Sequence, residues 1–326
     1  MPREMDLQEL LERFSAGQDA ALARTISVIE DERDGYERLL HALYPLSRYR
    51  MRLGVTGPPG AGKSTLVGRL AARIARGGET VGIIAVDPTS PFTGGALLGD
   101  RIRMDDVGNI PGVFIRSMGT RGSLGGLSRS TREVAMAMDA FGKDRIIIET
   151  VGVGQSELDI AGAADTTVVV LVPESGDGVQ AMKAGLLEIA DVIVINKADR
   201  EGAKRILREI SAMLELKPAG VDDWRVPVLE TVARDDVGVE EVLRAVDDHR
   251  HHMESSGLAE ERRRNRAHGE LREILEHEIL EQVLGSDGFE KNLDDAVERI
   301  MTSRSTPYHE AEQIIARLNV DRLNLN

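Results

Sequence analysis

The stretch GPPGAGKST at residues 57–65 decides how this chain can fold. It contains the pattern GxxxxGK[ST]. It lies between the short apolar run LGVT at 53–56 and the segment LVGRLAARIA at 66–75, whose apolar residues have helical spacing. A strand, a glycine-rich turn and a helix in this order are the context that a phosphate-binding loop requires. The pattern therefore predicts the first strand, loop and helix of a P-loop nucleotide-binding domain, in preference to a glycine-rich turn before a structural helix.

The residue types of this loop suit a nucleoside triphosphate. Backbone amides can close around phosphate oxygens where no β-carbon obstructs them, and the amino terminus of the following helix adds partial positive charge. Lys63 is expected to reach the β- and γ-phosphates, and Ser64 is expected to bind Mg²⁺. The residues expected to line the phosphates are Gly57, Pro58, Pro59, Gly60, Ala61, Gly62, Lys63, Ser64 and Thr65.

Seven short apolar runs, separated by helix-length segments, follow one another from Leu53 to about Ala245. Runs that are apolar on both faces of a strand are typical of a sheet buried on both sides. The sequence therefore predicts an α/β fold, a P-loop NTPase with a mostly parallel central sheet covered by helices on both faces. The runs are LGVT at 53, VGIIAV at 81, VFIRS at 113, RIIIE at 145, TVVVLV at 167, VIVIN at 192 and VPVLE at 226.

Both flanks of this region have helical spacing and no strand pattern. Residues 238–284 carry one long helical pattern, and residues 290–318 supply two shorter helices, the last beginning near Pro307. The charge run EERRRNR at 260–266 is most simply a solvated helix face, with a nucleic-acid patch as the alternative. The predicted division is an N-terminal helical segment at 1–48, a nucleotide-binding domain at 49–245 and a C-terminal helical arm at 246–326.

Composition excludes several classes of function. The chain has 326 residues, a net charge of -14 and 3% aromatic residues, which disfavours nucleic acid and anionic membranes as partners. It has no cysteine, so disulfides, iron–sulfur clusters and thiolate metal sites are excluded. The first residues lack the apolar core of a secretion signal, and no apolar stretch approaches the ~20 residues of a membrane span. We therefore expect a cytoplasmic protein.

The sequence NKAD at 196–199 predicts a preference for guanine. It closes the apolar run VIVIN, so it is expected at the carboxyl edge of the sheet, where ligands bind in open α/β folds. Asp199 can accept hydrogen bonds from guanine N1–H and the 2-amino group, whereas adenine would leave the carboxylate unpaired. Asn196 is expected to brace the loop, and Lys197 to lie over the base plane. A helix-capping role for the aspartate is the structural alternative.

A third segment of the base site is expected after the next strand, at LETVARDDVG, residues 229–238. GTPases usually carry a Ser-Ala pair at this place, whereas this chain has Val232 and Ala233. Backbone amides can still contact guanine O6, so these two residues are predicted to complete the base site.

Acidic residues at other strand ends are candidates for metal binding and for placing the attacking water. Asp87 ends the run VGIIAV and Glu149 ends RIIIE, so both carboxylates should emerge at the edge that carries the loop. Mg²⁺ prefers oxygen ligands and keeps several waters, and Asp100 is a third candidate for this site. Asp87 could orient the water, with Gln155 as its rival. Lys183, in a glycine-bearing loop, is either a further phosphate contact or a solvated lysine.

The histidines of DHRHHME raise the alternative of a metal-handling protein, because imidazole binds nickel and zinc well. Neighbouring helix positions point about 100° apart, so only His249 and His252 share a face. Together with the missing cysteines, this disfavours metal delivery. Trp224, beside a strand, is interpreted as a packing residue.

The combined motifs resemble the MeaB/ArgK family of GTPases, bacterial relatives of the human methylmalonic aciduria type A protein. The resemblance runs from about residue 5 to the end of the chain. The stretch AVDPTSPFTGGALLGDR within it is more specific than any phosphate loop. The motifs that carry it are GPPGAGKST, AVDPTSPFTGGALLGDRIRM, FIRSMGTRGSLGGLS, ETVGVGQSE, LVPESGDGVQAMKAG and NKAD.

This resemblance implies a function that the residues alone do not show. Members of the family bind and hydrolyse GTP, associate with methylmalonyl-CoA mutase, gate the delivery of adenosylcobalamin to it and protect it from inactivation. They are homodimers joined largely by the C-terminal helical arm, and their intrinsic hydrolysis is slow. The alternatives are a nickel-insertion GTPase and a kinase of a transport binding protein.

Overall fold

The computed structural model describes residues 7–87, 105–119, 127, 129–150, 156–173, 185–216, 224–284 and 289–317. The chain forms two compact units, Met1–Arg263 and Arg264–Asn326, which are treated separately below. Asp100, Gln155 and Lys183 lie outside the described residues. The three-part division at 48/49 and 245/246 stays a prediction.

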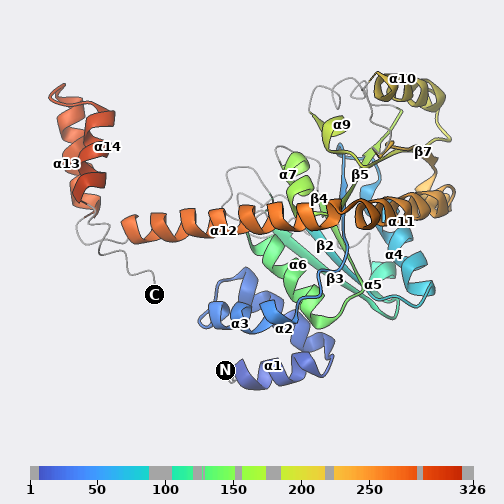
Figure 1. The fold of residues 1–326 in the computed structure, drawn as a ribbon, viewed down its shortest axis with the longest axis horizontal. Coiled ribbons are helices and arrows are strands. Elements are labelled where there is room, and N and C mark those ends of the chain that lie inside the picture. The colour runs from blue at the N-terminus through green and yellow to red at the C-terminus, as the bar shows by residue number, and fades with distance from the viewer. Residues whose placement is uncertain are drawn as a thin grey trace. The chain divides into compact units, whose positions relative to one another are not determined.

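The described residues of the first unit contain a seven-stranded sheet in the order β3-β2-β4-β1-β5-β6-β7 (Figure 1). Neighbouring strands are parallel throughout. Each strand coincides with one of the apolar runs, so the predicted α/β fold with a mostly parallel sheet is confirmed. The strands are β1 (Arg52–Thr56), β2 (Val81–Asp87), β3 (Val113–Gly119), β4 (Arg145–Thr150), β5 (Thr166–Leu171), β6 (Val192–Asn196) and β7 (Val228–Thr231).

Helices cover both faces of this sheet, as the strands that are apolar on both sides require. Alternate residues face opposite ways: Ile83 and Ile147 belong to the core beneath α4 and α11. Their neighbours Ile84 and Ile148 belong to the core on the other face. The helices of the first face are α4 (Lys63–Arg76), α5 (Asp105–Gly108) and α11 (Val239–Ser256); those of the second are α6 (Arg129–Phe141), α7 (Ser156–Ala163), α9 (Leu186–Ile189) and α10 (Ala203–Glu215).

The N-terminal helices pack against α6 as an outer layer on the second face. They are α1 (Leu7–Ser15), α2 (Asp19–Glu30) and α3 (Tyr36–Leu43). Asp139 on α6 is fully buried, and its carboxylate accepts a hydrogen bond from the hydroxyl of Ser47. It also accepts the amides of Arg48, Tyr49 and Arg50, at 3.1, 2.8 and 3.3 Å. One carboxylate therefore fixes the connection between the helical layer and β1.

Replacing Asp139 by alanine is expected to lower the free energy of unfolding by about 2 to 3 kcal/mol, because three amides and a hydroxyl lose their buried acceptor. Urea unfolding followed by circular dichroism measures this loss. The exposed Asp34→Ala variant is the matched control and should unfold like the parent. Equal midpoints for the two variants would contradict this role of Asp139.

The predicted helical pattern over 238–284 is interrupted in the structure. Helix α11 ends at Ser256, and Gly257 takes a left-handed backbone with φ of 79° before α12 (Leu258–Leu284) begins. Glycine adopts this conformation without the penalty of a β-carbon, so the chain can change direction here. Among the described residues, no helix is both long enough and apolar enough to cross a membrane.

The second unit contains α13 (Phe289–Met301) and α14 (Pro307–Arg317), in agreement with the two shorter predicted helices. Proline occupies the first position of α14, as predicted, and the hydroxyl of Thr306 accepts the amide of His309 at 3.2 Å. Arg299 on α13 donates two hydrogen bonds to Glu310 on α14, at 2.9 and 2.7 Å. The two helices are thus joined by a bidentate ion pair.

The hydrogen bonds from Arg299 lower the pKa of the Glu310 carboxyl from 4.5 to about 2. Because this pKa is depressed in the folded state, the ion pair stabilises the helix pair above pH 4.5, and the stabilisation is lost as the pH falls toward 2. Glu310→Gln is therefore expected to speed hydrogen exchange in α13 and α14 at pH 7, and its difference from the parent should shrink below pH 4.5. Glu312→Gln, at an exposed position of the same helix, should exchange like the parent at both pH values. A pH-independent difference would contradict the ion pair.

Candidate nucleotide-binding site

The loop between β1 and α4 is shaped by contacts with neighbouring strands. Gly57 has φ of 138°, and a β-carbon there would lie 2.1 Å from the carbonyl oxygen of Val170 on β5. Gly62 has φ of 87°, and a β-carbon there would lie 2.3 Å from Nδ2 of Asn196. These two positions therefore require glycine because of the fold around them, in addition to the room that phosphate oxygens need.

Lys63 and Ser64 both point toward the loop and the strand ends beside it. Lys63 is 5% exposed, and its Nζ donates to the carbonyl oxygens of Gly57 and Pro58 at 2.8 and 3.0 Å. The hydroxyl of Ser64 donates to Oε1 of the buried Glu149 at 2.6 Å. The first two residues of α4 thus place an ammonium group inside the phosphate loop and a hydroxyl against a carboxylate at the carboxyl edge of the sheet.

The structure describes only part of the other residues predicted to bind the metal or to place the water. Asp87 is the last residue of β2, where its backbone pairs with Gly119, so it lies at the same edge as Glu149. Its side chain, like Asp100, Gln155 and Lys183, is outside the described part of the chain. The roles of these residues stay predictions.

Asn196 connects three segments of the site. It is 3% exposed at the end of β6, and its Nδ2 donates to the carbonyl oxygen of Ala61 in the phosphate loop at 2.8 Å. Its Oδ1 accepts the hydroxyl of Thr231 at 3.1 Å and the amide of Ala233 at 3.0 Å. One side-chain amide therefore holds the phosphate loop, the NKAD loop and the segment after β7 together.

The other base-site candidates lie around Asn196. Lys197 has φ of 57°, and its Nζ donates to the carbonyl oxygen of Gly60 at 2.8 Å. Asp199 is exposed, with its Oδ2 3.7 Å from Nη2 of Arg234. We expected backbone amides of this segment to face guanine O6, but the Ala233 amide here donates to Asn196. Val232 comes directly before the 3₁₀ turn Ala233–Asp235. The structure thus brings the predicted base-site residues to one side of the phosphate loop.

Sequence reasoning missed three residues beside this site. Burial raises the pKa of the Glu157 carboxyl, and the charge of Lys63 opposes this rise. Glu157 lies in the first turn of α7, where an acidic residue after a strand end was a signal that could have been used. Thr231 ends β7 and Arg234 lies just after this strand. The contacts of these two residues with Asn196 and Asp199 depend on how β6 and β7 are paired.

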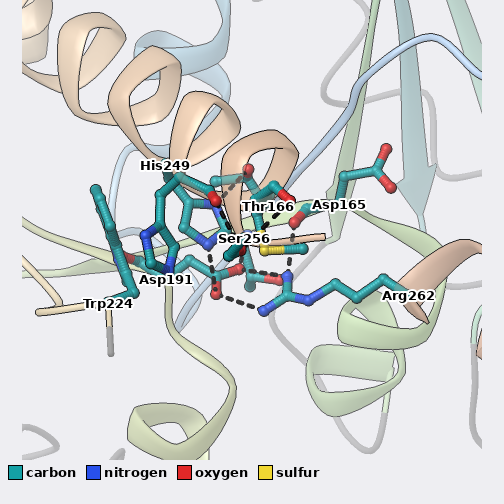
Figure 2. A network of polar contacts seen from close by, with 10 residues as sticks. Asp165, Thr166, Asp191, Trp224, His249, Ser256 and Arg262 are labelled. Atoms are coloured by element: carbon teal, nitrogen blue, oxygen red, sulfur yellow. Dashed lines mark hydrogen bonds and ion pairs between the residues drawn. The ribbon is translucent and has the colours of Figure 1, made fainter. Parts of the chain in front are cut away.

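The three histidines of the DHRHHME segment do not form a common metal site, and each has a different partner. His249 is buried, with Nδ1 2.8 Å from the hydroxyl of Thr166 (Figure 2). Nδ1 of His251, by contrast, lies 2.7 Å from the carbonyl oxygen of Asp247. His252 faces the ring of Trp224 at 5.5 Å between centroids. In the described ranges, no group of three or more His, Cys, Asp or Glu side chains could hold a metal ion.

Trp224 packs as predicted. Its ring lies 4.9 Å from that of His249, edge to face, so it contacts both His249 and His252. The prediction that these two histidines share a helix face is therefore confirmed. Trp224 also donates its Nε1–H to the carbonyl oxygen of Asp191 at 2.7 Å.

Comparison with known proteins identifies the family. The family model described as methylmalonyl-CoA mutase-associated GTPase MeaB matches residues 22–287. A Pyrococcus abyssi protein is 45% identical over 96% of this chain and 97% of its own length. The mouse methylmalonic aciduria type A homolog, mitochondrial, is 31% identical over 92% of this chain and 76% of its own.

A solved structure agrees with this assignment. The crystal structure titled LAO/AO transport system kinase has 28% identity and a TM-score of 0.72, and it covers 98% of this chain and 99% of that one. The phosphate loop, the guanine-type loop and the parallel sheet described above agree with the family match. The chain therefore belongs to the MeaB family of P-loop GTPases.

Proposed function

We propose that this protein is a GTP-hydrolysing chaperone that binds methylmalonyl-CoA mutase, gates adenosylcobalamin delivery to it and protects it from inactivation. The observation that supports guanine chemistry is the position of Asn196, which links the phosphate loop to both segments of the base site. The description of the family as mutase-associated, and the likeness to the mouse methylmalonic aciduria protein, support the partner.

In the proposed site, the residues from Gly57 to Thr65 hold the phosphates and Asn196, Lys197, Asp199, Val232 and Ala233 hold the base. Water attacks the γ-phosphorus in line, the new P–O bond forms, and the bond to the β-phosphate oxygen breaks. Lys63 offsets the charge that develops on the phosphate oxygens. Asp87 or Gln155 places the water.

The donor set fits Mg²⁺. Ser64 and Glu149 place a hydroxyl and a carboxylate oxygen 2.6 Å apart, and oxygen ligands of this kind suit a hard cation that keeps part of its water shell. Ser64, Glu149, Asp87 and Asp100 are the proposed residues around it. When bound with GTP, the ion would supply positive charge that offsets the charge of the phosphate oxygens.

We further propose that the protein is a cytoplasmic homodimer joined through the C-terminal arm. Several large apolar side chains of the second unit are exposed, and burial against a second copy would remove them from water. Size-exclusion chromatography with light scattering tests this, with Leu271→Glu expected to give a monomer and Arg272→Glu as the neighbouring control. The exposed side chains include Leu271, Leu275, Leu280, Met301, Tyr308 and Ile315.

Co-purification with methylmalonyl-CoA mutase tests the chaperone proposal. Tagged protein loaded with GDP or with a non-hydrolysable GTP analogue is expected to retain the mutase to different extents, and mutase should raise the rate of GTP hydrolysis. Equal retention in both states, together with an unchanged hydrolysis rate, would contradict the proposal. If the protein retained neither the mutase nor a guanine nucleotide, the assignment as a GTPase would be contradicted as well.

A kinase acting on a transport binding protein is the second candidate, because a solved structure with 28% identity to this chain is described as a LAO/AO transport system kinase. The two functions differ in where the γ-phosphate goes. With GTP labelled at that phosphate, the proposed chaperone releases only inorganic phosphate, whereas a kinase transfers the label to protein. Label on a binding protein would favour the kinase.

A further inference from the structure

Figure 2 shows a polar cluster around Asp191. Asp165, Thr166 and Asp191 come just before or at the start of β5 and β6, so the cluster lies at the amino edge of the sheet, at the opposite ends of the strands from the nucleotide site. It joins the residues before β5, β6 and β7 to the helices α11 and α12. Nothing in the proposed GTP chemistry uses it. We call it the Asp191 network, and its members are Asp165, Thr166, Asp191, Trp224, His249 and Arg262.

Asp191 is the acceptor at the centre of this network. Its Oδ1 lies 2.9 Å from Nη2 of Arg262 and 3.3 Å from Nε2 of His249. Its Oδ2 accepts Nη1 of Arg262 at 3.1 Å and the amide of Thr167 at 2.8 Å. Burial opposes ionisation of this carboxyl, but the hydrogen bonds from His249 and Arg262 outweigh it and lower its pKa. The carboxylate therefore stays charged and needs a cation beside it.

The negative charge of the Asp191 carboxylate is balanced when the Arg262 guanidinium is the one cation bound to it. A proton added to His249 would place a second positive charge on the same carboxylate oxygen, in a setting where charge is poorly solvated. We propose that the Arg262 guanidinium and a proton on His249 alternate as the charge partner of Asp191, so that proton uptake at His249 releases the first turns of α12 from the sheet.

Thr166 can hydrogen-bond the imidazole of His249 in both its neutral and its protonated form. Its hydroxyl lies 2.8 Å from Nδ1 of His249. It can donate to the neutral ring or, after rotation, accept N–H from the protonated ring. His249 can therefore take up a proton without losing a hydrogen-bond partner.

Burial decides which cation leaves. The side chain of His249 is 1% exposed and is held in place by the surrounding side chains, whereas that of Arg262 is 39% exposed and can turn outward. Arg262 also lies only five positions after Gly257, whose left-handed backbone separates α12 from α11. Among the residues described, two further titratable groups adjoin the network. Asp165 accepts Nη1 of Arg262 at its carbonyl oxygen, at 2.6 Å, and its charge favours the guanidinium, whereas His252 on α11 packs against Trp224. Release of the arginine is thus the change with the smaller desolvation cost.

Trp224 is the only tryptophan of the chain, and it contacts His249 and His252. An imidazolium quenches indole fluorescence more strongly than neutral imidazole does, so fluorescence against pH reports proton uptake at these rings. Because His252 also contacts Trp224, the measurement is made in the His252→Gln background, where we expect a quenching transition that a further His249→Gln substitution removes. In Arg262→Gln, the midpoint of the transition should lie at higher pH, because Asp191 then lacks its cation.

Arg263→Gln is the matched control for the arginine. Arg263 lies over the ring of Tyr49, 5.7 Å from its centroid, and makes no recorded contact with Asp191 among the described residues. Its midpoint should equal that of the parent. If Arg262→Gln and Arg263→Gln give the same midpoint, Arg262 and the proton do not compete, and the proposal is overturned.

Hydrogen exchange tests release of the helix, after correction for the pH dependence of intrinsic exchange. Linkage between the two events is reciprocal. If removing the Arg262–Asp191 contact favours proton binding at His249, then proton binding at His249 must weaken the Arg262–Asp191 contact by the same free energy. The amides of residues 258–263 should therefore exchange faster in the parent at the acid side of the fluorescence transition than at the alkaline side. In His249→Gln the exchange should not depend on pH. Protection that is unchanged across the transition in the parent would overturn the proposal, and this measurement does not need any variant to fold.

Discussion

Replacing Asp199 by asparagine is expected to lower the affinity for GDP by about 10³-fold, or about 4 kcal/mol, because two charge-assisted hydrogen bonds from guanine are lost. The same change should raise the affinity for XDP. Xanthine presents N1–H and a carbonyl at position 2, which match the acceptor and donor of the new amide. The preference between the two bases should therefore change by roughly 10⁴-fold or more, as expected when a site built for hydrogen bonding meets its mismatch.

Isothermal titration with GDP, XDP and ADP measures this change. The control is Glu201→Gln, which removes a charge two residues away at an exposed position and should leave guanine preference intact. Asp199 is itself exposed, so the substitution is not expected to affect folding. An Asp199→Asn variant that still prefers GDP would show that another group reads the base.

Replacing Lys63 by alanine is expected to reduce kcat/KM for GTP hydrolysis by about 10³-fold, or about 4 kcal/mol of transition-state stabilisation. Its ammonium group lies inside the loop, 2.8 Å from the carbonyl oxygen of Gly57 and 3.0 Å from that of Pro58. In the proposed complex it would turn to the β- and γ-phosphates, where charge develops as the bond breaks. Affinity for GDP should fall less, since GDP lacks the γ-phosphate.

Single-turnover hydrolysis of GTP measures this loss without interference from product release. Lys204→Ala, at an exposed position on α10, is the matched control and should retain the activity of the parent. Unfolding midpoints for both variants separate a catalytic loss from a folding defect. Hydrolysis in Lys63→Ala within a few-fold of the parent would remove the lysine from the proposed mechanism.

The sheet could be predicted from the sequence because its strands are apolar on both faces. Runs such as VGIIAV and TVVVLV can be buried only between two layers of helices, and this restricts them to a parallel sheet. The helix break at Gly257 was not predicted, because the apolar spacing continues across it. A single left-handed residue leaves the pattern of side chains almost unchanged, although it redirects the backbone.

The candidate site was predicted one motif at a time, and its internal contacts were not. The motifs indicated which residues belong to the loop and the base site, since each has a fixed spacing after a strand. That Asn196 holds Ala61 and Ala233 together depends on β1, β5, β6 and β7 lying side by side. Strand order is a long-range property, and no local pattern records it.

The sequence by itself determined the phosphate loop, the seven strands and the guanine-type motif, because these depend on neighbouring residues and on the period of the backbone. Only the tertiary structure decided that Ser64 meets Glu149, that Glu157 lies near Lys63, and that His249 and Arg262 share one oxygen of Asp191. The physical reason is that burial and charge act between side chains far apart in the chain. The strength of such an interaction is set by distance and solvent exclusion, which exist only once the sheet has formed.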